Sequence, residues 1–249
     1  MRKIAISLSK GGVGKTTTAV HLAHGLARRG NRVLLIDTDT QGQGASFLGA
    51  NPKRSLSAVI EDDVAPTEAT EEVRENLWLL AGGRAMANTR KFIDMKDFGG
   101  ERTFIEALAP LEDKYDYVII DTGPGWDSLT ANALFYATEV LIPASLEAAT
   151  LQGILEFQNS IERVKQYHDD LDFRYVVPTY LDSRVKKDEE IHGILEEHFG
   201  DKLCPPIRYN VRLSEAAGLG KTIFEYDESA RGAQDYEKLT NHIANNGQT

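Results

Sequence analysis

Residues 7–17 read SLSKGGVGKTT and follow a short apolar run, and this stretch decides the fold. Loops that bind nucleotide phosphates have the pattern G-x-x-x-x-G-K-[ST], with a strand before them and a helix after them. Residues 14–16 (GKT) supply the end of this pattern. Ser9 stands where the first glycine belongs, and a second lysine, Lys10, follows it. The stretch therefore predicts a phosphate-binding loop that carries one additional cation.

The residues of this loop have distinct expected roles. Its glycines allow backbone N–H groups to surround phosphate oxygens without Cβ clashes. The helix that begins near Lys15 directs the positive end of its dipole at the same anion. We expect Lys15 to reach the β- and γ-phosphates of ATP and the Thr16 hydroxyl to bind Mg²⁺. The residues expected to contact the nucleotide here are Lys10, Gly11, Gly12, Val13, Gly14, Lys15, Thr16 and Thr17.

The composition narrows the class of protein. The chain of 249 residues has a formal net charge of -10, which argues against a uniformly basic surface but leaves room for a local basic patch. Its one cysteine, Cys204, excludes a disulfide framework and a CxxC redox pair. No stretch approaches the ~18 apolar residues of a membrane span, and residues 1–9 lack the long apolar core of a signal peptide. We expect a cytoplasmic protein.

The apolar runs predict an α/β fold. Runs such as 33–36 are apolar on both faces, which suits the interior of a parallel sheet. We expect one doubly wound domain over residues 1–249, with helices on both faces of a mostly parallel sheet. Segment 51–75 should hold a short helix and an exposed loop. Strands are expected over 3–8, 33–36, 77–80, 117–120, 140–143 and 173–179, and helices over 16–29, 128–136, 151–167, 187–199 and 230–243.

Three aspartates follow predicted strands. Asp121 ends the apolar run 115–121 (YDYVIID), an arrangement that predicts a carboxylate holding Mg²⁺ directly or through water. Asp37 and Asp39 follow the run 33–36 and should lie at the same edge of the sheet. We expect Asp39 to position the attacking water and Asp37 to support the Mg²⁺ shell, with only one of the two carboxylates touching the water. The expected catalytic residues are Lys10, Lys15 and Asp39.

Five segments together resemble the ParA/Soj family of deviant-Walker partition ATPases, within the ParA/MinD superfamily. They are KGGVGKTT (10–17), DTDTQG (37–42), VIIDTGPG (118–125), TYLDSR (179–184) and NVRLSEA (210–216). The resemblance implies a P-loop ATPase that uses ATP and Mg²⁺, releases ADP and phosphate slowly, and is stimulated by a partner. It also implies a homodimer in the ATP state. Lys10 matches the family's signature lysine, which reaches the phosphates bound by the other subunit.

Some positions depart from the family's pattern. Thr40 replaces the proline of the usual DxDPQ, and residues 122–126 read TGPGW. The family's Ile-Pro-Arg-Asn segment, which lies by the adenine in relatives, reads IRYN at 207–210. From the resemblance we expect Arg208, Tyr209 and Asn210 to contact the nucleotide, with Arg208 or Tyr209 stacked on the base.

The resemblance further implies DNA binding without sequence preference in the ATP state. Arg184 matches a DNA-contacting arginine of the family, and the expected patch is completed by Lys186, Lys187, Arg212 and Lys221. On composition alone, the mixed-charge run 184–190 (RVKKDEE) is equally typical of a solvated helix start. A ParB-like or other adaptor, often with a short basic segment, would link the ATPase to a plasmid, a chromosome or a protein compartment. The ATP-bound protein would then associate with the nucleoid.

Two alternatives lack DNA binding. A MinD-like membrane ATPase would end in a basic amphipathic helix with bulky apolar residues, whereas residues 235–249 (DYEKLTNHIANNGQT) are polar, which argues against membrane attachment. A small-molecule kinase or ligase of the same fold would use the same ATP site and add a substrate pocket. The sequence leaves this second alternative open.

Overall fold

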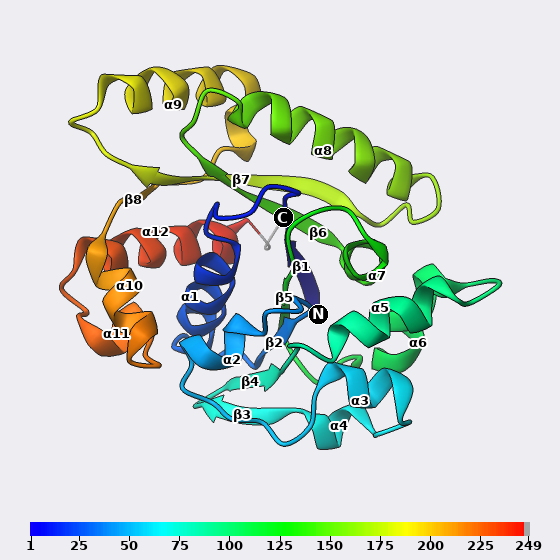
Figure 1. The fold of residues 1–249 in the computed structure, drawn as a ribbon. Helices are drawn as coiled ribbons and strands as arrows, with labels where there is room; N and C mark the ends of the chain where they lie inside the picture. Colours follow the sequence, from blue (N-terminus) through cyan, green and yellow to red (C-terminus); the bar gives the residue numbers. More distant parts are fainter. Residues whose placement is uncertain (247–249) are drawn as a thin grey trace.

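A computed structural model describes residues 1–246 of the chain, and the last three residues of the polar segment 235–249 lie outside it. One eight-stranded sheet forms its centre, in the order β3-β4-β2-β5-β1-β6-β7-β8 (Figure 1). Every neighbouring pair is parallel except β3 and β4. The strands are β1 (Arg2–Ile6), β2 (Val33–Asp37), β3 (Glu71–Arg74), β4 (Leu77–Leu80), β5 (Tyr117–Asp121), β6 (Glu139–Ser145), β7 (Asp172–Leu181) and β8 (Ile207–Arg208).

Helices cover both faces of this sheet (Figure 1). One face packs against α1 (Lys15–Ala27), α11 (Ile223–Tyr226) and α12 (Arg231–Asn245), with α2 (Gln43–Phe47) and α10 (Val211–Gly218) beside them. The other face packs against α3 (Leu56–Glu61), α4 (Pro66–Ala69), α5 (Met86–Asp94), α6 (Thr103–Leu108), α7 (Ser128–Tyr136), α8 (Thr150–Lys165) and α9 (Lys186–Phe199). Short 3-10 turns are η1 (Gly100–Arg102), η2 (Ala109–Leu111) and η3 (Gly200–Lys202). Within residues 1–246, no helix has both the length and the apolar character needed to cross a bilayer.

The predicted fold class is confirmed. The two sides of β1 explain why: Ile4 and Ile6 belong to the apolar core under α1, whereas Ala5 belongs to the core under α7 and α8. All three side chains are fully buried. A central strand with a helix layer on each face must be apolar on both sides, which is the pattern in the sequence.

The prediction for residues 51–75 is incomplete. This segment holds two helices, α3 and α4, and then β3, which pairs antiparallel with β4 at the edge of the sheet. The sequence of β3, EEVR, has no apolar alternation, and its two glutamates are exposed. Pairing with β4 and the tight turn at Asn76, with φ 60°, decide its conformation. An edge strand with charged side chains is protected from pairing with other chains.

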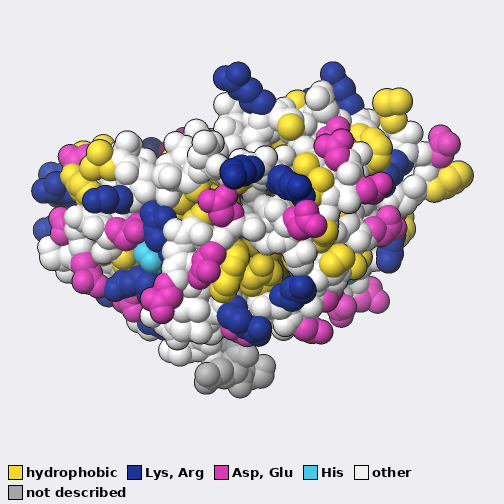
Figure 2. All heavy atoms as spheres, turned by 90° about the horizontal axis from the view of Figure 1, so that it is seen from below, with side chains coloured by type: hydrophobic (Ala, Val, Ile, Leu, Met, Phe, Trp, Pro, Cys, Tyr) yellow, Lys and Arg dark blue, Asp and Glu magenta, His cyan; other side chains and the backbone are white. Residues whose placement is uncertain are grey.

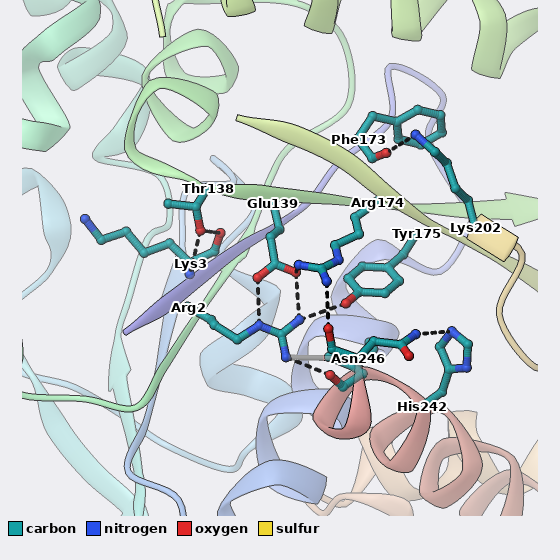
Figure 3. Close-up of polar contacts among 11 residues, drawn as sticks. Arg2, Lys3, Thr138, Glu139, Phe173, Arg174, Tyr175, Lys202, His242 and Asn246 are labelled. Atoms are coloured by element: carbon teal, nitrogen blue, oxygen red, sulfur yellow. Dashed lines mark hydrogen bonds and ion pairs between the residues drawn. The ribbon is translucent and has the colours of Figure 1, made fainter. Parts of the chain in front are cut away.

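An ion cluster fastens the amino-terminal ends of the strands, opposite the phosphate loop (Figure 3). The Arg2 guanidinium donates two hydrogen bonds of 2.7 Å to Glu139, the first residue of β6. It also donates to the Ile243 carbonyl at 2.6 Å, and Arg174 donates to the Asn246 carbonyl at 2.6 Å. These carbonyls lie at the end of α12, where a helix leaves acceptors without intrahelical partners. The cluster therefore holds α12 against β1, β6 and β7.

Candidate active site

The phosphate loop joins β1 to α1 along residues 7–14. Gly12 and Gly14 have φ of 74° and 89°, a region that favours glycine. Gly14 is the N-cap of α1, and no side chain caps the helix there. The first N–H groups of α1 are therefore available to an anion, and the helix dipole favours negative charge at this point. The Val13 carbonyl accepts a hydrogen bond from the Thr179 hydroxyl at 3.0 Å, which fastens the loop to β7.

Two adjoining pockets open at this loop. The first, of about 230 Å³, is lined by the loop residues Gly11, Gly12, Gly14, Lys15, Thr16 and Thr17, and by Asp39 and Pro124. The second, of about 100 Å³, is lined by Arg208, Tyr209 and Asn210 and by residues of α10. Both pockets share Gly14, Thr17, Phe47 and Tyr180. The structure thus brings the expected phosphate-binding and base-contacting residues to one continuous depression.

Lys15 lies in the floor of the first pocket and is buried. Its ammonium donates a hydrogen bond to the Lys10 carbonyl at 2.9 Å. Burial lowers the pKa of Lys15, and the carboxylates of Asp121 and Asp39 oppose this shift. Lys15 alone does not balance the two carboxylates beside it, so a divalent cation bound together with the phosphates would offset the negative charge of the site.

Lys10 has a different environment from Lys15. Its ammonium lies 2.7 Å from Oε2 of Glu147, in the loop between β6 and α8. Both side chains are exposed, and the hydrogen bond from Lys10 lowers the pKa of Glu147. The second lysine of the loop is therefore held away from the pocket floor by a contact within the same chain.

Asp121 and Asp37 end neighbouring strands, β5 and β2, and are paired in register. Both are buried, and neither oxygen of the Asp121 carboxylate has a hydrogen-bond partner among residues 1–246. Burial raises the pKa of Asp121 well above its usual range, and the Asp37 charge adds to this, while the Thr16 hydroxyl and Lys15 oppose it. An unpartnered buried carboxylate beside a threonine hydroxyl fits the oxygen ligands that Mg²⁺ prefers.

Asp37 is engaged by the backbone. Its two oxygens accept hydrogen bonds from the N–H groups of Asp39 at 2.9 Å and Gly44 at 3.0 Å. Burial raises its pKa to about 6, although these two N–H groups oppose the shift. Asp37 therefore shapes the loop that carries Asp39, and its proposed support of the Mg²⁺ shell stays a prediction.

Asp39 lies at the rim of the phosphate pocket and is partly exposed. Its Oδ1 accepts a hydrogen bond from the Gln41 N–H at 3.0 Å. A Cβ added to Gly123 would lie 3.4 Å from the same oxygen, so the segment after β5 passes closely over this carboxylate. Asp37 is the last residue of β2 and Asp39 lies two residues beyond it; of the two, only Asp39 lines the pocket. Residues two apart in a strand share a face, so this difference arises because the chain leaves β2 after Asp37 and not from strand alternation.

In the second pocket, Arg208 is fixed by Asp235 of α12. Two guanidinium nitrogens donate to the Asp235 carboxylate, the shorter bond being 2.7 Å, and the Arg208 N–H donates to it at 3.0 Å. Asn210 caps α10 by accepting from the Arg212 N–H at 2.9 Å. Tyr209 is exposed. Arg208 and Tyr209 thus line the pocket, while Asn210 also holds the start of α10.

The sequence did not single out Phe47 and Tyr180, although both residues line both pockets. Tyr180 has φ 61°, an uncommon conformation for a tyrosine, and its hydroxyl would lie 3.4 Å from a Cβ at Gly14. Phe47 ends α2, a five-residue helix without a clear periodic signal. Tyr180 lies in the segment TYLDSR (179–184), which contributes to the family resemblance but did not predict a residue of the nucleotide site, and Phe47 lies in no such segment. The fold brings both rings beside the loop.

The cations expected to bind DNA are mostly paired with carboxylates of the same chain. Arg184 pairs with Asp182 at 2.6 Å, Lys186 with Glu190 at 3.8 Å, and Arg212 with Glu215 at 3.1 Å. In residues 1–246, Lys187 and Lys221 have no carboxylate within 4.0 Å. A further cation, Arg231, lines a cavity together with Arg184 and Arg208. On the face shown in Figure 2, basic and acidic side chains are interspersed rather than gathered by sign.

Known proteins resemble the whole chain. The model of a family described as "AAA domain" matches residues 1–173. Sporulation initiation inhibitor protein Soj of Bacillus subtilis is 36% identical and covers 98% of both chains. Chromosome-partitioning ATPase Soj of Thermus thermophilus is 33% identical, over 98% of this chain and 95% of that protein.

The fold also matches solved structures. Cobyrinic acid a,c-diamide synthase from Mycobacterium smegmatis, with bound ADP and magnesium, superposes with a TM-score of 0.85 and 28% identity, over 100% of this chain and 96% of that one. The phosphate loop, the aspartates at the ends of β2 and β5, and the full-length similarity lead to one assignment. The chain belongs to the Soj/ParA family of P-loop ATPases and is an ATPase.

Proposed function

We propose that this ATPase dimerises when it binds ATP, binds DNA without sequence preference and positions cargo through a ParB-like or other adaptor protein. The observation that carries the proposal is the second lysine of the phosphate loop. Lys10 lies on the exposed rim of the site, where a partner subunit has access to it, while Lys15 occupies the floor. The relatives named for chromosome partitioning support the assignment of cargo positioning.

The site residues divide the chemistry of phosphoryl transfer among them. The backbone N–H groups of residues 11–17 and the Lys15 ammonium would bind the phosphates, and Asp39 would orient the attacking water. Thr16 and Asp121 would hold Mg²⁺, whose charge stabilises the phosphate oxygens when it is bound. Phe47, Tyr180 and the segment 207–210 would enclose the base. No covalent intermediate is required, because catalysis here is positioning and charge stabilisation.

In the dimer, Lys10 would exchange Glu147 for the phosphates bound by the other subunit. A cation supplied from a second subunit stabilises the transition state, and it also makes ATP bind the dimer better than the monomer. The interface would be two-fold, with the same face on both chains. Nucleotide state would then control assembly.

DNA binding would use Arg184, Lys186, Lys187, Arg212 and Lys221, joined by Arg231. The ion pairs that hold Arg184 and Arg212 are exposed, and exposed pairs contribute little to stability, so phosphates can replace the carboxylates. Contacts to phosphates alone give affinity without base readout and a strong dependence on salt.

The test is binding to a random-sequence duplex with ATP, with ADP and without nucleotide, over a salt series. Asp39→Ala with ATP serves to accumulate the ATP state. We expect binding only with ATP, weakening as salt rises, and lost in Arg184→Glu/Lys187→Glu. The control is Lys238→Glu, which reverses the charge of one exposed lysine on α12. ATP hydrolysis without DNA binding in any nucleotide state would contradict the proposal.

A second candidate function is a ligase that acts on a small molecule. The similarity to a diamide synthase at 28% identity favours it. A ligase would consume ATP only when its substrate and a nitrogen donor are present, whereas a positioning ATPase hydrolyses ATP slowly alone and faster with its partners. Phosphate release from the purified protein with and without DNA therefore separates the two.

A further inference from the structure

An apolar groove lies on the side of the sheet away from α1, between η1, α7 and α8. Its volume is about 570 Å³. Three aromatic rings line it, those of Trp126, Phe135 and Tyr167, together with Ala131 of α7. Trp126 packs edge to face on Phe157 with the ring centroids 5.8 Å apart, so the core fixes its position. The groove is separate from the two pockets of the nucleotide site, with which it shares no lining residue.

The aromatic lining is open to solvent. Tyr167 is 79% exposed and Trp126 is 42% exposed. Pockets for small molecules enclose most of the ligand surface, whereas two of the three rings that line this groove are exposed. Exposed aromatic patches of this kind mark sites for protein partners, and an amphipathic helix laid in an apolar groove is a common mode of such docking.

The rim of the groove is cationic. Arg102 and Arg163 line it, and among residues 1–246 neither has a carboxylate within 4.0 Å. Arg163 donates one hydrogen bond to the Ser160 hydroxyl at 2.9 Å, and Glu101 is the one carboxylate in the lining. This chain has 38 acidic residues against 28 basic ones, and most of its other arginines have acidic partners. Arg102 and Arg163, which have no acidic partner in residues 1–246, flank the aromatic groove.

We propose that this groove binds an acidic amphipathic helix of a partner protein. Its apolar side chains would pack on Trp126, Phe135 and Tyr167, and its carboxylates would pair with Arg102 and Arg163, which form bidentate bonds with carboxylates. A basic segment, which the family resemblance leads us to expect of the adaptor, would be repelled here. The groove therefore differs from any surface that binds a basic segment of the adaptor. The proposal for the groove does not depend on the proposed DNA binding.

The groove is connected to the nucleotide site by the segment after β5. Pro124 lines the phosphate pocket, the Gly125 N–H donates to the Ser9 carbonyl of the phosphate loop at 2.8 Å, and Trp126 lines the groove. A docked helix would therefore contact Trp126, two residues from Pro124 of the phosphate pocket, within the same segment, 122–126. Tyr167 and Arg163 lie at the opposite end of α8 from Glu147, so the docked helix would leave Lys10 accessible.

The test is a selection from a library of random 16-residue peptides displayed on phage, against the full chain. Peptides that bind the wild type are counter-selected against Ala131→Trp, which fills the groove, and against Arg102→Glu/Arg163→Glu. Both arginines are exposed, so their reversal should not impair folding, and circular dichroism checks this. We expect the groove-dependent peptides to carry a net negative charge and apolar residues at helical spacing.

The affinity of one selected peptide is then measured by the change in Trp126 fluorescence. We expect Arg102→Glu/Arg163→Glu to weaken binding about tenfold or more, since two attractive charge pairs become repulsive. Lys238→Glu should leave it unchanged. The proposal would be overturned if the groove-dependent peptides were basic or uncharged, or if no groove-dependent peptide were found. It would also be overturned if the charge-reversed variant bound the selected peptide as tightly as the wild type. Self-association of the chain that Ala131→Trp abolishes would identify a second copy as the occupant and also overturn it.

Discussion

The ammonium of Lys10 lies 2.7 Å from the carboxylate of Glu147, although the two residues are 137 positions apart. The contact joins the phosphate loop to the loop that follows β6. Since the proposed role of Lys10 is to reach phosphates on another subunit, the two uses of this lysine exclude one another. On that proposal, Glu147 competes with dimer formation.

Glu147→Gln should favour the ATP-bound dimer. Removing the charge frees Lys10 from an exposed ion pair worth about 0.2–1 kcal/mol. Two such pairs are released per two-fold dimer, so the dimer dissociation constant should decrease by up to about 30-fold. Sedimentation with ATP over a range of protein concentrations measures it. Glu156→Gln, on the exposed side of α8, is the control. A dimer weakened by Glu147→Gln would show that this carboxylate acts across the interface instead.

Asp121→Asn should stabilise the free protein and impair its response to Mg²⁺ and ATP. The carboxylate is buried without a hydrogen-bond partner in residues 1–246, so replacing it with a neutral amide removes the cost of a buried charge. We expect a gain of about 1–2 kcal/mol, or ~3–6 °C in melting temperature, without nucleotide. The further rise produced by Mg²⁺-ATP in the wild type should be smaller in the variant. A lower melting temperature without nucleotide would contradict this account of Asp121.

Asp39→Ala should abolish hydrolysis and leave ATP binding intact. Asp39 lies at the rim of the phosphate pocket, where it can orient water without being needed to hold the phosphates. A fall of about 100-fold or more in kcat is expected for the loss of a group that positions or activates the nucleophile. Nucleotide affinity is measured separately with a fluorescent ATP analogue.

Two further variants serve as comparisons for Asp39→Ala. Thr40→Ala tests whether disturbance of the same loop suffices, because its hydroxyl contacts Asp39 at 3.5 Å. Lys15→Ala should instead lose ATP binding itself, since Lys15 is the buried cation of the pocket. Normal hydrolysis by Asp39→Ala would show that another group orients the water.

Stability should fall in acid through His21 and His24 of α1. Burial lowers the pKa of both to about 4. Nε2 of His21 accepts from the Ile223 N–H at 2.9 Å, so its Nδ1 donates to the Thr17 carbonyl at 2.7 Å and the ring is neutral. Between pH 6.5 and 4 the unfolded chain binds more protons than the folded one, so the free energy of unfolding decreases as pH falls through this window.

From pH 7.5 to 5, each of these histidines should contribute a loss of about 2 kcal/mol. Urea unfolding at the two pH values measures it, and His21→Gln should reduce the loss by about that amount. The buried carboxylates Asp37 and Asp121 titrate in the opposite sense, because their raised pKa values make the folded chain bind protons first. Comparison with the variant separates the histidine from them, and the exposed His198→Gln is the control. An equal pH dependence in His21→Gln and the wild type would contradict the assignment.

Much of the fold could be read from local pattern. The runs 33–36 and 117–120 are apolar on both faces because each lies inside a sheet covered by helices, and α7 begins and ends where predicted. Strand β3 could not be read in this way. Its charged, exposed sequence acquires a strand conformation only by pairing with β4.

By itself, the sequence determined the phosphate loop, the two lysines and the aspartates after the strands, because glycine conformation, helix start and strand end are local properties. Tertiary structure decided what each of these groups faces. It buried Asp121 without a partner, gave both oxygens of Asp37 to backbone N–H groups, and brought Glu147 to Lys10. It also placed Phe47 and Tyr180 beside the loop. Contacts between residues far apart in the chain depend on how helices and strands pack, and a local pattern carries no information about them.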